Sequence, residues 1–141
     1  MRILRNLSKP LVLMPIGGGI YYLIETIWRG HSHWTMLIVG GLCFYLIGLI
    51  NEVLPWELGF VWQCLIAAGV ITLVELTAGY IINIRLGWGI WDYSHLPGNF
   101  MGQVCLLYSL FWVLLSGVGI WLDDWLRYFL YGEDRPKYKL F

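Results

Sequence analysis

The chain has 141 residues, of which 59% are hydrophobic and only 13% charged, and its mean hydropathy is +0.68. A soluble domain carries more charge on its surface, so this composition excludes an ordinary soluble protein and predicts an integral membrane protein. The formal net charge is zero and no stretch is densely basic, so no nucleic-acid partner is expected.

The first hydrophobic segment covers about 11–28 and follows the basic residues Arg2, Arg5 and Lys9. This start resembles a secretory signal peptide. However, Pro15 and three consecutive glycines interrupt the apolar run, and no small-residue cleavage pattern follows it. We therefore expect the segment to remain in the protein as a transmembrane helix.

Three further hydrophobic segments complete the predicted bundle. A second helix is predicted over 34–54, a tight turn over 55–57, a third helix over 58–82 and a fourth over 101–122. The longer connection 83–100 joins the last two helices. About 20 apolar residues cross a bilayer, so four spans use nearly the whole chain. The sequence therefore predicts an all-α fold, a four-transmembrane-helix bundle that forms one membrane domain over all 141 residues.

Charged and aromatic residues alternate at helical spacing over 123–131, beyond the fourth apolar run. Asp123 and Arg127 are four residues apart, in the order that favours an ion pair on a helix. This pattern predicts an interfacial C-terminal extension of the fourth helix that lies at the lipid headgroups.

Basic residues predict the orientation in the membrane. Four spans place both termini on one side, and that side carries seven of the nine basic residues. They are Arg2, Arg5, Lys9, Arg127, Arg135, Lys137 and Lys139. Because basic loops stay in the cytoplasm, we expect a multi-pass protein of the bacterial cytoplasmic membrane with both termini cytoplasmic.

Glu75 is the ionisable residue that lies deepest in a predicted span. Such a group costs on the order of 3 kcal/mol or more in a bilayer, so it needs a structural or functional reason. Ala68, Thr72 and Gly79 fall on the same helix face, and small residues allow a neighbouring helix to approach. We therefore expect Glu75 to face the bundle, either as a ligand-binding group or as a carboxyl that locks helix packing.

Polar residues gather on the side of the membrane opposite the termini. Glu25 lies one turn before Arg29, in the order that favours an ion pair. The other members of this set come from the second half of the third helix and from the two outer connections. They are His31, His33, Glu75, Arg85, Asp92, His95, Asn99 and Gln103. This asymmetry predicts a polar cavity that opens outward.

The connection 83–100 has two interpretations. Trp91 and Tyr93 are typical of residues that anchor a loop at the membrane interface. Alternatively the loop dips back among the helices, where Asp92 and Asn99 would satisfy backbone amides. In either case Asn99 and Gln103 are expected at the start of the fourth helix.

Metal binding and nucleophilic catalysis are weakly indicated. His31, His33, His95 and Asp92 could supply four metal ligands, but histidines two residues apart before a tryptophan are typical of a headgroup loop. Ser94 next to His95 and near Asp92 has the residue types of a triad, but adjacent loop residues rarely meet its geometry. No metal, cofactor or catalytic residue is therefore assigned.

The outer connection carries a motif. The run W-D-Y-S-H-L-P-G-N-F-M-G-Q-V-C-L over 91–106, with S-L-F-W at 109–112, resembles the motif of a family of small bacterial membrane proteins. That family is labelled "putative ABC-transporter type IV". The stretches E-L-T-A-G at 75–79 and I-E-T at 24–26 resemble two further parts of its pattern. The resemblance covers most of the chain.

This resemblance implies a transport-related membrane protein and places four residues in one constellation. They are Glu75, Asp92, Asn99 and Gly102. The full set that we expect to form a substrate-binding or structural polar cluster is Glu75, Asp92, Asn99, Gln103, Glu25, Tyr93 and Trp91.

Three functions remain open. The first is a small permease-like subunit that binds a solute or ion in an outward-facing polar pocket. The second is a structural membrane protein that recruits a larger partner or another copy of itself. The third is an intramembrane enzyme on a lipid or isoprenoid-like substrate, with Glu75 and Asp92 as acid and base. A dry packing at Glu75 would favour the second function, and a lipid-sized apolar groove would favour the third.

Overall fold

The computed structural model describes residues 2–50, 58–133 and 135–138, and this part of the chain is helical. The elements are α1 (Arg2–Arg29), α2 (Thr35–Gly48), α4 (Phe60–Gly79), the π-helix η1 (Tyr80–Arg85) and α5 (Leu106–Tyr131). Within the described residues the only β-type pairing is an isolated bridge from Phe100 to Val104. The predicted all-α fold is confirmed.

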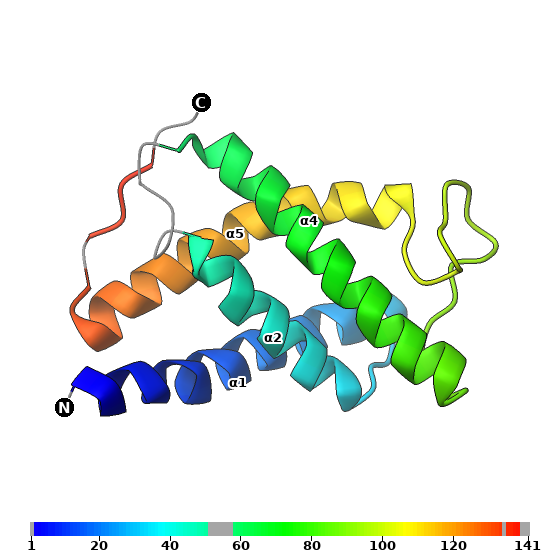
Figure 1. Ribbon diagram of the computed structural model, residues 1–141, viewed down its shortest axis with the longest axis horizontal. Helices are drawn as coiled ribbons and strands as arrows, with labels where there is room; N and C mark the ends of the chain where they lie inside the picture. The colour runs from blue at the N-terminus through cyan, green and yellow to red at the C-terminus, as the bar shows by residue number, and fades with distance from the viewer. Residues whose placement is uncertain (1, 51–57, 134, 139–141) are drawn as a thin grey trace.

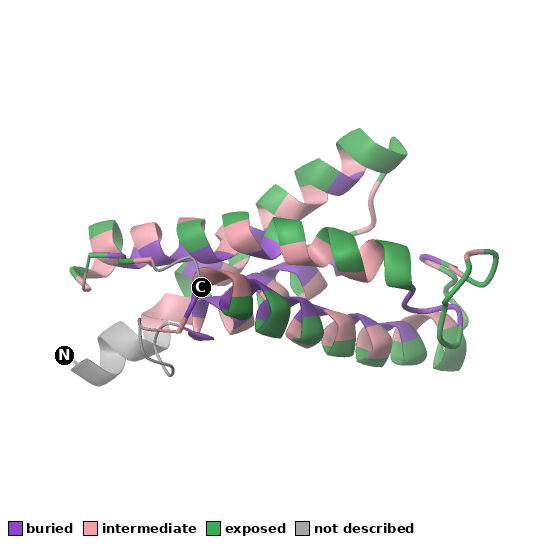
Figure 2. Cartoon of the chain, turned by 90° about the horizontal axis from the view of Figure 1, so that it is seen from above, coloured by how far each residue is buried: buried purple, intermediate pink, exposed green. Residues whose placement is uncertain are grey.

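Among the described residues, three helices are long and apolar enough to cross a membrane: Ser8–Arg29 within α1, Phe60–Arg85 across α4 and η1, and Leu106–Tyr131. Thr35–Gly48 is apolar but shorter. The predicted second helix extended to residue 54, and its last part and the turn at 55–57 lie outside the described residues. Figure 2 shows the pattern expected of such helices, with buried residues on the faces turned toward one another and exposed residues outside.

The first helix extends further toward the N-terminus than the predicted segment 11–28, although its candidate membrane span, Ser8–Arg29, agrees with that segment. α1 begins at Arg2 rather than near residue 11, and both Pro10 and Pro15 lie inside it. Proline removes one backbone donor from a helix, and in a membrane bundle neighbouring groups compensate for the loss. The basic N-terminal residues therefore extend the helix and do not precede it as a separate segment.

The predicted start of the fourth helix was wrong. α5 begins at Leu106 and not at 101, because Met101 and Gly102 have φ angles of 57° and 70°. Those angles lie in the left-handed region, which cannot continue a right-handed helix. Asn99 and Gln103 consequently belong to the connection and not to the helix.

The segment 123–131 continues α5 without a break, up to Gly132 in the left-handed conformation at its C-cap. The Asp123–Arg127 pair is confirmed, with Arg127 Nε donating to Asp123 Oδ2 at 2.7 Å. Both side chains are buried between helices. Gly48 of α2 explains the burial, since a Cβ there would strike the Asp123 carboxylate.

Glycines bring α1 and α2 into direct contact, and the two helices lie side by side in Figure 1. A Cβ at Gly18 would strike the backbone oxygen of Leu37, and a Cβ at Gly41 would strike that of Met14. The two helices therefore pack backbone against backbone, as small residues permit inside a membrane. The glycine run in the first segment, which interrupts its hydropathy, serves as a packing surface.

The two ends of the bundle have different contacts. At one end the start of α1 meets the end of α5: Lys9 pairs with Glu133, and the Tyr131 hydroxyl donates to the Ser8 carbonyl at 3.3 Å. At the other end the last turn of α1 contacts the connection between η1 and α5, where Arg29 donates to the Ile90 carbonyl. The start of α1 and the end of α5 therefore lie opposite the connection 86–105 (Figure 1).

Candidate functional site

The connection 86–105 is fixed to the end of the third helix by side chains. Asn83, on the π-helical turn, donates to Gln103 Oε1 at 2.7 Å and accepts from the Ile90 amide at 2.7 Å. The Trp91 indole donates to the Gln103 carbonyl at 3.0 Å, and Gln103 itself packs against Gly79. Trp91 and Gln103 are buried, so these two side chains anchor the loop to the bundle, whereas most residues between them are exposed.

Asp92 and Asn99 hold the shape of this loop. Asp92 Oδ1 accepts from the Ser94 amide at 2.9 Å, and Asn99 Oδ1 accepts from the Gly102 amide at 3.1 Å. The expectation that these two residues satisfy backbone amides is confirmed. The Ser94 amide, and after it the Ser94 hydroxyl, hold the pKa of Asp92 below its ordinary value. Asp92 is therefore an ionised group at the surface of the loop.

Glu75 projects from α4 into the bundle, as predicted. Its side chain is 7% exposed, and Ala68 and Gly79 on the same face are also buried. The Trp112 indole of α5 approaches the carboxyl. However, neither Glu75 Oε1 nor Trp112 Nε1 completes a hydrogen bond with any described residue. A buried polar atom in this condition costs about 1–3 kcal/mol, so the position needs a reason beyond packing.

A cavity of about 320 Å³ lies between Glu75 and the connection. Its polar lining comes from α1, α4 and the loop and consists of Glu25, Arg29, Glu75, Asp92, Tyr93 and His95. Aromatic side chains of Tyr21, Trp91, Tyr108 and Trp112 complete most of the wall. Glu75 of α4 and Asp92 of the loop are both among the residues that line this cavity.

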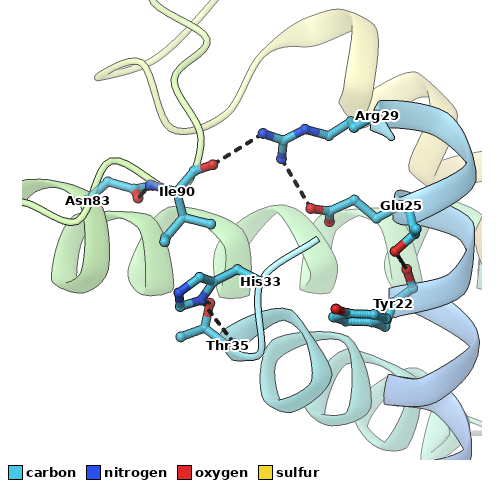
Figure 3. A network of polar contacts seen from close by, with 8 residues as sticks. Tyr22, Glu25, Arg29, His33, Thr35, Asn83 and Ile90 are labelled. Carbon is cyan, nitrogen blue, oxygen red and sulfur yellow. Dashed lines mark hydrogen bonds and ion pairs between the residues drawn. The ribbon is translucent and has the colours of Figure 1, made fainter. Parts of the chain in front are cut away.

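Arg29 connects the rim of this cavity to the loop (Figure 3). It donates through one nitrogen to Glu25 Oε1 at 3.1 Å and through another to the Ile90 carbonyl at 3.3 Å. The predicted Glu25–Arg29 pair is thus confirmed, but Glu25 is 7% exposed and not a surface group. The pair joins the end of α1 to the same loop that carries Asp92.

A second, smaller cavity of about 110 Å³ adjoins the first and is mostly apolar. Its walls come from all four helices, and Glu75, Tyr21, Trp91 and Trp112 line both spaces. Glu75 therefore lies at the junction of a polar cavity and an apolar cavity.

The structure divides the predicted cluster into two groups. Glu25, Glu75, Trp91, Asp92 and Tyr93 line the larger cavity. Asn99 and Gln103 are not in that lining: Asn99 bonds to the backbone of the connection, and Gln103 Oε1 accepts from Asn83. Tyr93 stacks on Tyr108 with ring centroids 4.8 Å apart, and burial raises its pKa, so its phenol stays neutral.

Sequence reasoning missed the aromatic wall of the site. Tyr21, Tyr108 and Trp112 look like ordinary lipid-facing or interfacial residues in apolar runs. The available signal was helical spacing: Tyr21 and Glu25 are four residues apart on one face of α1, and Tyr108 and Trp112 are four apart on α5. The smaller cavity had no signal in the sequence, because it depends on how the four helices cross.

The histidines do not form a metal centre in the part of the chain that the structure describes, where no three His, Cys, Asp or Glu side chains are grouped to hold an ion. His33 Nδ1 instead lies 2.8 Å from the Thr35 hydroxyl (Figure 3), and its ring packs near Trp88. Asp92 accepts from the Ser94 backbone amide and also engages the Ser94 hydroxyl directly, whereas in a triad a histidine stands between the hydroxyl and the carboxylate.

Comparison with known proteins gives one family. The family model described as "Putative ABC-transporter type IV" matches residues 16–131, which include α2, α4, the connection and α5. No solved structure matches the chain.

Proposed function

Because the chain belongs to the family described as "putative ABC-transporter type IV", we propose that it is a small permease-like membrane subunit. It binds a solute that carries a cationic or hydrogen-bond-donating group in the cavity at Glu75. The observation that carries this proposal is the Glu75 carboxyl, which is buried beside the cavity and whose Oε1 has no hydrogen-bond partner among the described residues.

The residues that line the cavity favour a cationic ligand. Three carboxyl groups and one guanidinium line it, and the guanidinium of Arg29 is already paired with Glu25. A positively charged group next to Glu75 would gain both a hydrogen bond and an ion pair in a place of low dielectric. The volume of about 320 Å³ is at the lower end of ligand pockets, which are roughly 300–1,000 Å³.

A purely structural role explains Glu75 less well. A carboxyl that locks helix packing should bond to the helices that it joins, since a half-satisfied buried group destabilises the fold. The buried carboxyl of Asp123, at the opposite end of the bundle, does have such a bond, since it accepts from Arg127 Nε on the same helix.

An intramembrane enzyme is the second candidate, because an apolar cavity reaches Glu75. Its proposed partner Asp92 is, however, engaged with the Ser94 amide. We therefore place binding and transport before catalysis.

The proposed orientation puts both termini in the cytoplasm and the cavity on the outer side, because most basic residues are at the chain ends. A larger membrane partner or a nucleotide-hydrolysing subunit would supply the energy for transport. The lipid bilayer is the surrounding medium in either case.

Carbodiimide modification tests the proposal. Dicyclohexylcarbodiimide is apolar and attacks carboxyl groups within membrane proteins, so it should modify Glu75 in protein reconstituted into phosphatidylcholine nanodiscs. Protonated N,N-dimethylalkylamines of increasing chain length serve as cationic probes that donate one hydrogen bond and cannot be acylated. We expect at least one of them to slow the modification of Glu75 by about tenfold, equal to about 1.4 kcal/mol.

Peptide mass spectrometry would follow the modification at Glu75, and at Glu133 as an internal control at the other end of the bundle. The proposal would be contradicted if no amine in the series changed the rate of carbodiimide modification at Glu75. A parallel loss of reactivity at Glu75 and Glu133 would also contradict it, because the amine would then be acting on the reagent and not on the site.

A further inference from the structure

The smaller cavity is an apolar groove between α1 and α5. Residues Ile20 and Ile24 of α1 form one side, and Leu115 and Val118 of α5 form the other. Its floor includes Cys43 of α2 and Ile71 of α4. Within the described residues, Glu75 is the only charged side chain in this lining.

The mouth of the groove faces the side of the bundle. α1 packs along α2 and α5 packs along α4, whereas α1 and α5 make few contacts with each other. The rim residues on both helices are apolar and exposed, with Ile24 40% and Val118 65% exposed. Both helices are long and apolar enough to span a membrane, so such a rim would face lipid chains rather than water.

Glu75 lies where this groove meets the polar cavity, and its carboxyl oxygen Oε1 lacks a partner among described residues. A ligand in both spaces would therefore place an apolar part among the groove residues and a charged part at the carboxyl. The Trp112 indole faces the same junction and likewise completes no hydrogen bond with the described chain.

From this junction we infer the class of the ligand: a single-chain amphiphilic amine, which enters from the membrane between α1 and α5. Its protonated amine binds Glu75 in the polar cavity, and its chain occupies the groove. This inference rests on the proposed function, since it assigns a substrate class and an entry route to the same site. The net negative lining selects the cation, and the apolar groove selects the chain.

Chain length is the first test, in the carbodiimide assay described above. N,N-dimethyldodecylamine should protect Glu75 at a concentration about tenfold lower than N,N-dimethylbutylamine, a difference equal to about 1.4 kcal/mol. Dodecanol has the same chain without a charge and should not protect. Equal protection by the short and long amines, or by dodecanol, would overturn the inference and leave the proposed function standing.

Blocking the groove separates specific binding from simple accumulation of the long amine in the bilayer. Val118→Trp and Cys43→Trp place a large side chain in the groove and away from the larger cavity. Both variants should lose the advantage of the long amine while keeping protection by the short one. Leu114→Trp is the matched control, because Leu114 lies one turn earlier on α5, is 73% exposed and lines neither cavity.

Three results are then distinct. Loss of the chain-length advantage in the two blocked variants, but not in Leu114→Trp, supports the inference. An unchanged advantage in the blocked variants overturns it. Protection on adding phosphatidylethanolamine to the nanodiscs, with no protection by the free amines, would also overturn it, because the ligand would then be a two-chain lipid. Failure of every probe at Glu75 would remove the proposed function as well.

Discussion

Glu75 has a side chain whose hydrogen-bonding capacity is only partly used by its described surroundings. It is buried, and its Oε1 has no hydrogen-bond partner in the described part of the protein. Natural proteins retain groups that lower stability mainly where function requires them. The second carboxyl of the pocket differs, because Asp92 is exposed and its bond to the Ser94 amide lowers its pKa. Glu75 and Asp92 therefore differ in environment, since Glu75 is buried in the bundle and Asp92 is bonded to the backbone of the loop.

Substitution of Glu75 should separate stability from binding. From the sequence alone glutamine is expected to be better tolerated than leucine, because leucine would leave polar partners unpaired. The structure reverses this order, since no partner is bonded to Oε1 among the described residues. We expect the free energy of unfolding of Glu75→Leu to equal or exceed that of the native protein, with a gain of about 1–3 kcal/mol at most. Thermal unfolding in detergent measures this, and a Glu75→Leu protein less stable than Glu75→Gln would show that the carboxyl is bonded.

At the level of the helices, glycines permit the closest contact, which joins α1 to α2. Gly17 and Gly18 of α1 face α2, where a Cβ would strike Phe44 and the Leu37 backbone respectively. Gly19 is different, because nothing lies within 4 Å of a Cβ built there. Gly17 and Gly18 therefore leave no room for a side chain, whereas Gly19 does.

Gly18→Ala and Gly19→Ala form a matched pair. Gly18→Ala should separate α1 from α2 and cost about 1–3 kcal/mol through overpacking. Gly19→Ala should be neutral or gain about 0.5–1 kcal/mol, because alanine is the better helix former. Unfolding of both variants in the same detergent gives the comparison. Equal effects would contradict the close approach of the two helices.

The sequence predicted what depends on composition and periodicity, namely the all-helical class, the inward face of Glu75 and the Glu25–Arg29 pair. It did not predict features that depend on backbone angles or on helix crossing. The start of α5 moved because Met101 and Gly102 adopt positive φ. The burial of Asp123 required the space left by Gly48 on another helix. The apolar groove arises only where α1 and α5 diverge, so no single segment encodes it.

At the scale of the whole molecule, the chain ends and the cavity lie at opposite ends of the bundle. The contacts of Lys9 with Glu133 define one end, and those of Arg29 with Ile90 define the other. The distribution of basic residues then predicts that the cavity end faces outward.

Cysteine labelling in cells tests this orientation. In a background without the three native cysteines, His31→Cys and Lys137→Cys each place a thiol at an exposed position, one at each end. A membrane-impermeant maleimide should label the cysteine at position 31 in intact cells and the one at 137 only after lysis. The opposite labelling pattern would show that the protein has the reverse orientation, with the cavity facing the cytoplasm.

The most direct test of the central claim is equilibrium binding of radiolabelled N,N-dimethyldodecylamine to the protein in phosphatidylcholine nanodiscs. The native protein should bind one amine per chain in a saturable manner. Glu75→Leu should lose this binding while keeping its thermal stability, so that the loss cannot come from unfolding. Saturable binding that survives in Glu75→Leu, or binding that never saturates in the native protein, would contradict a solute site at Glu75.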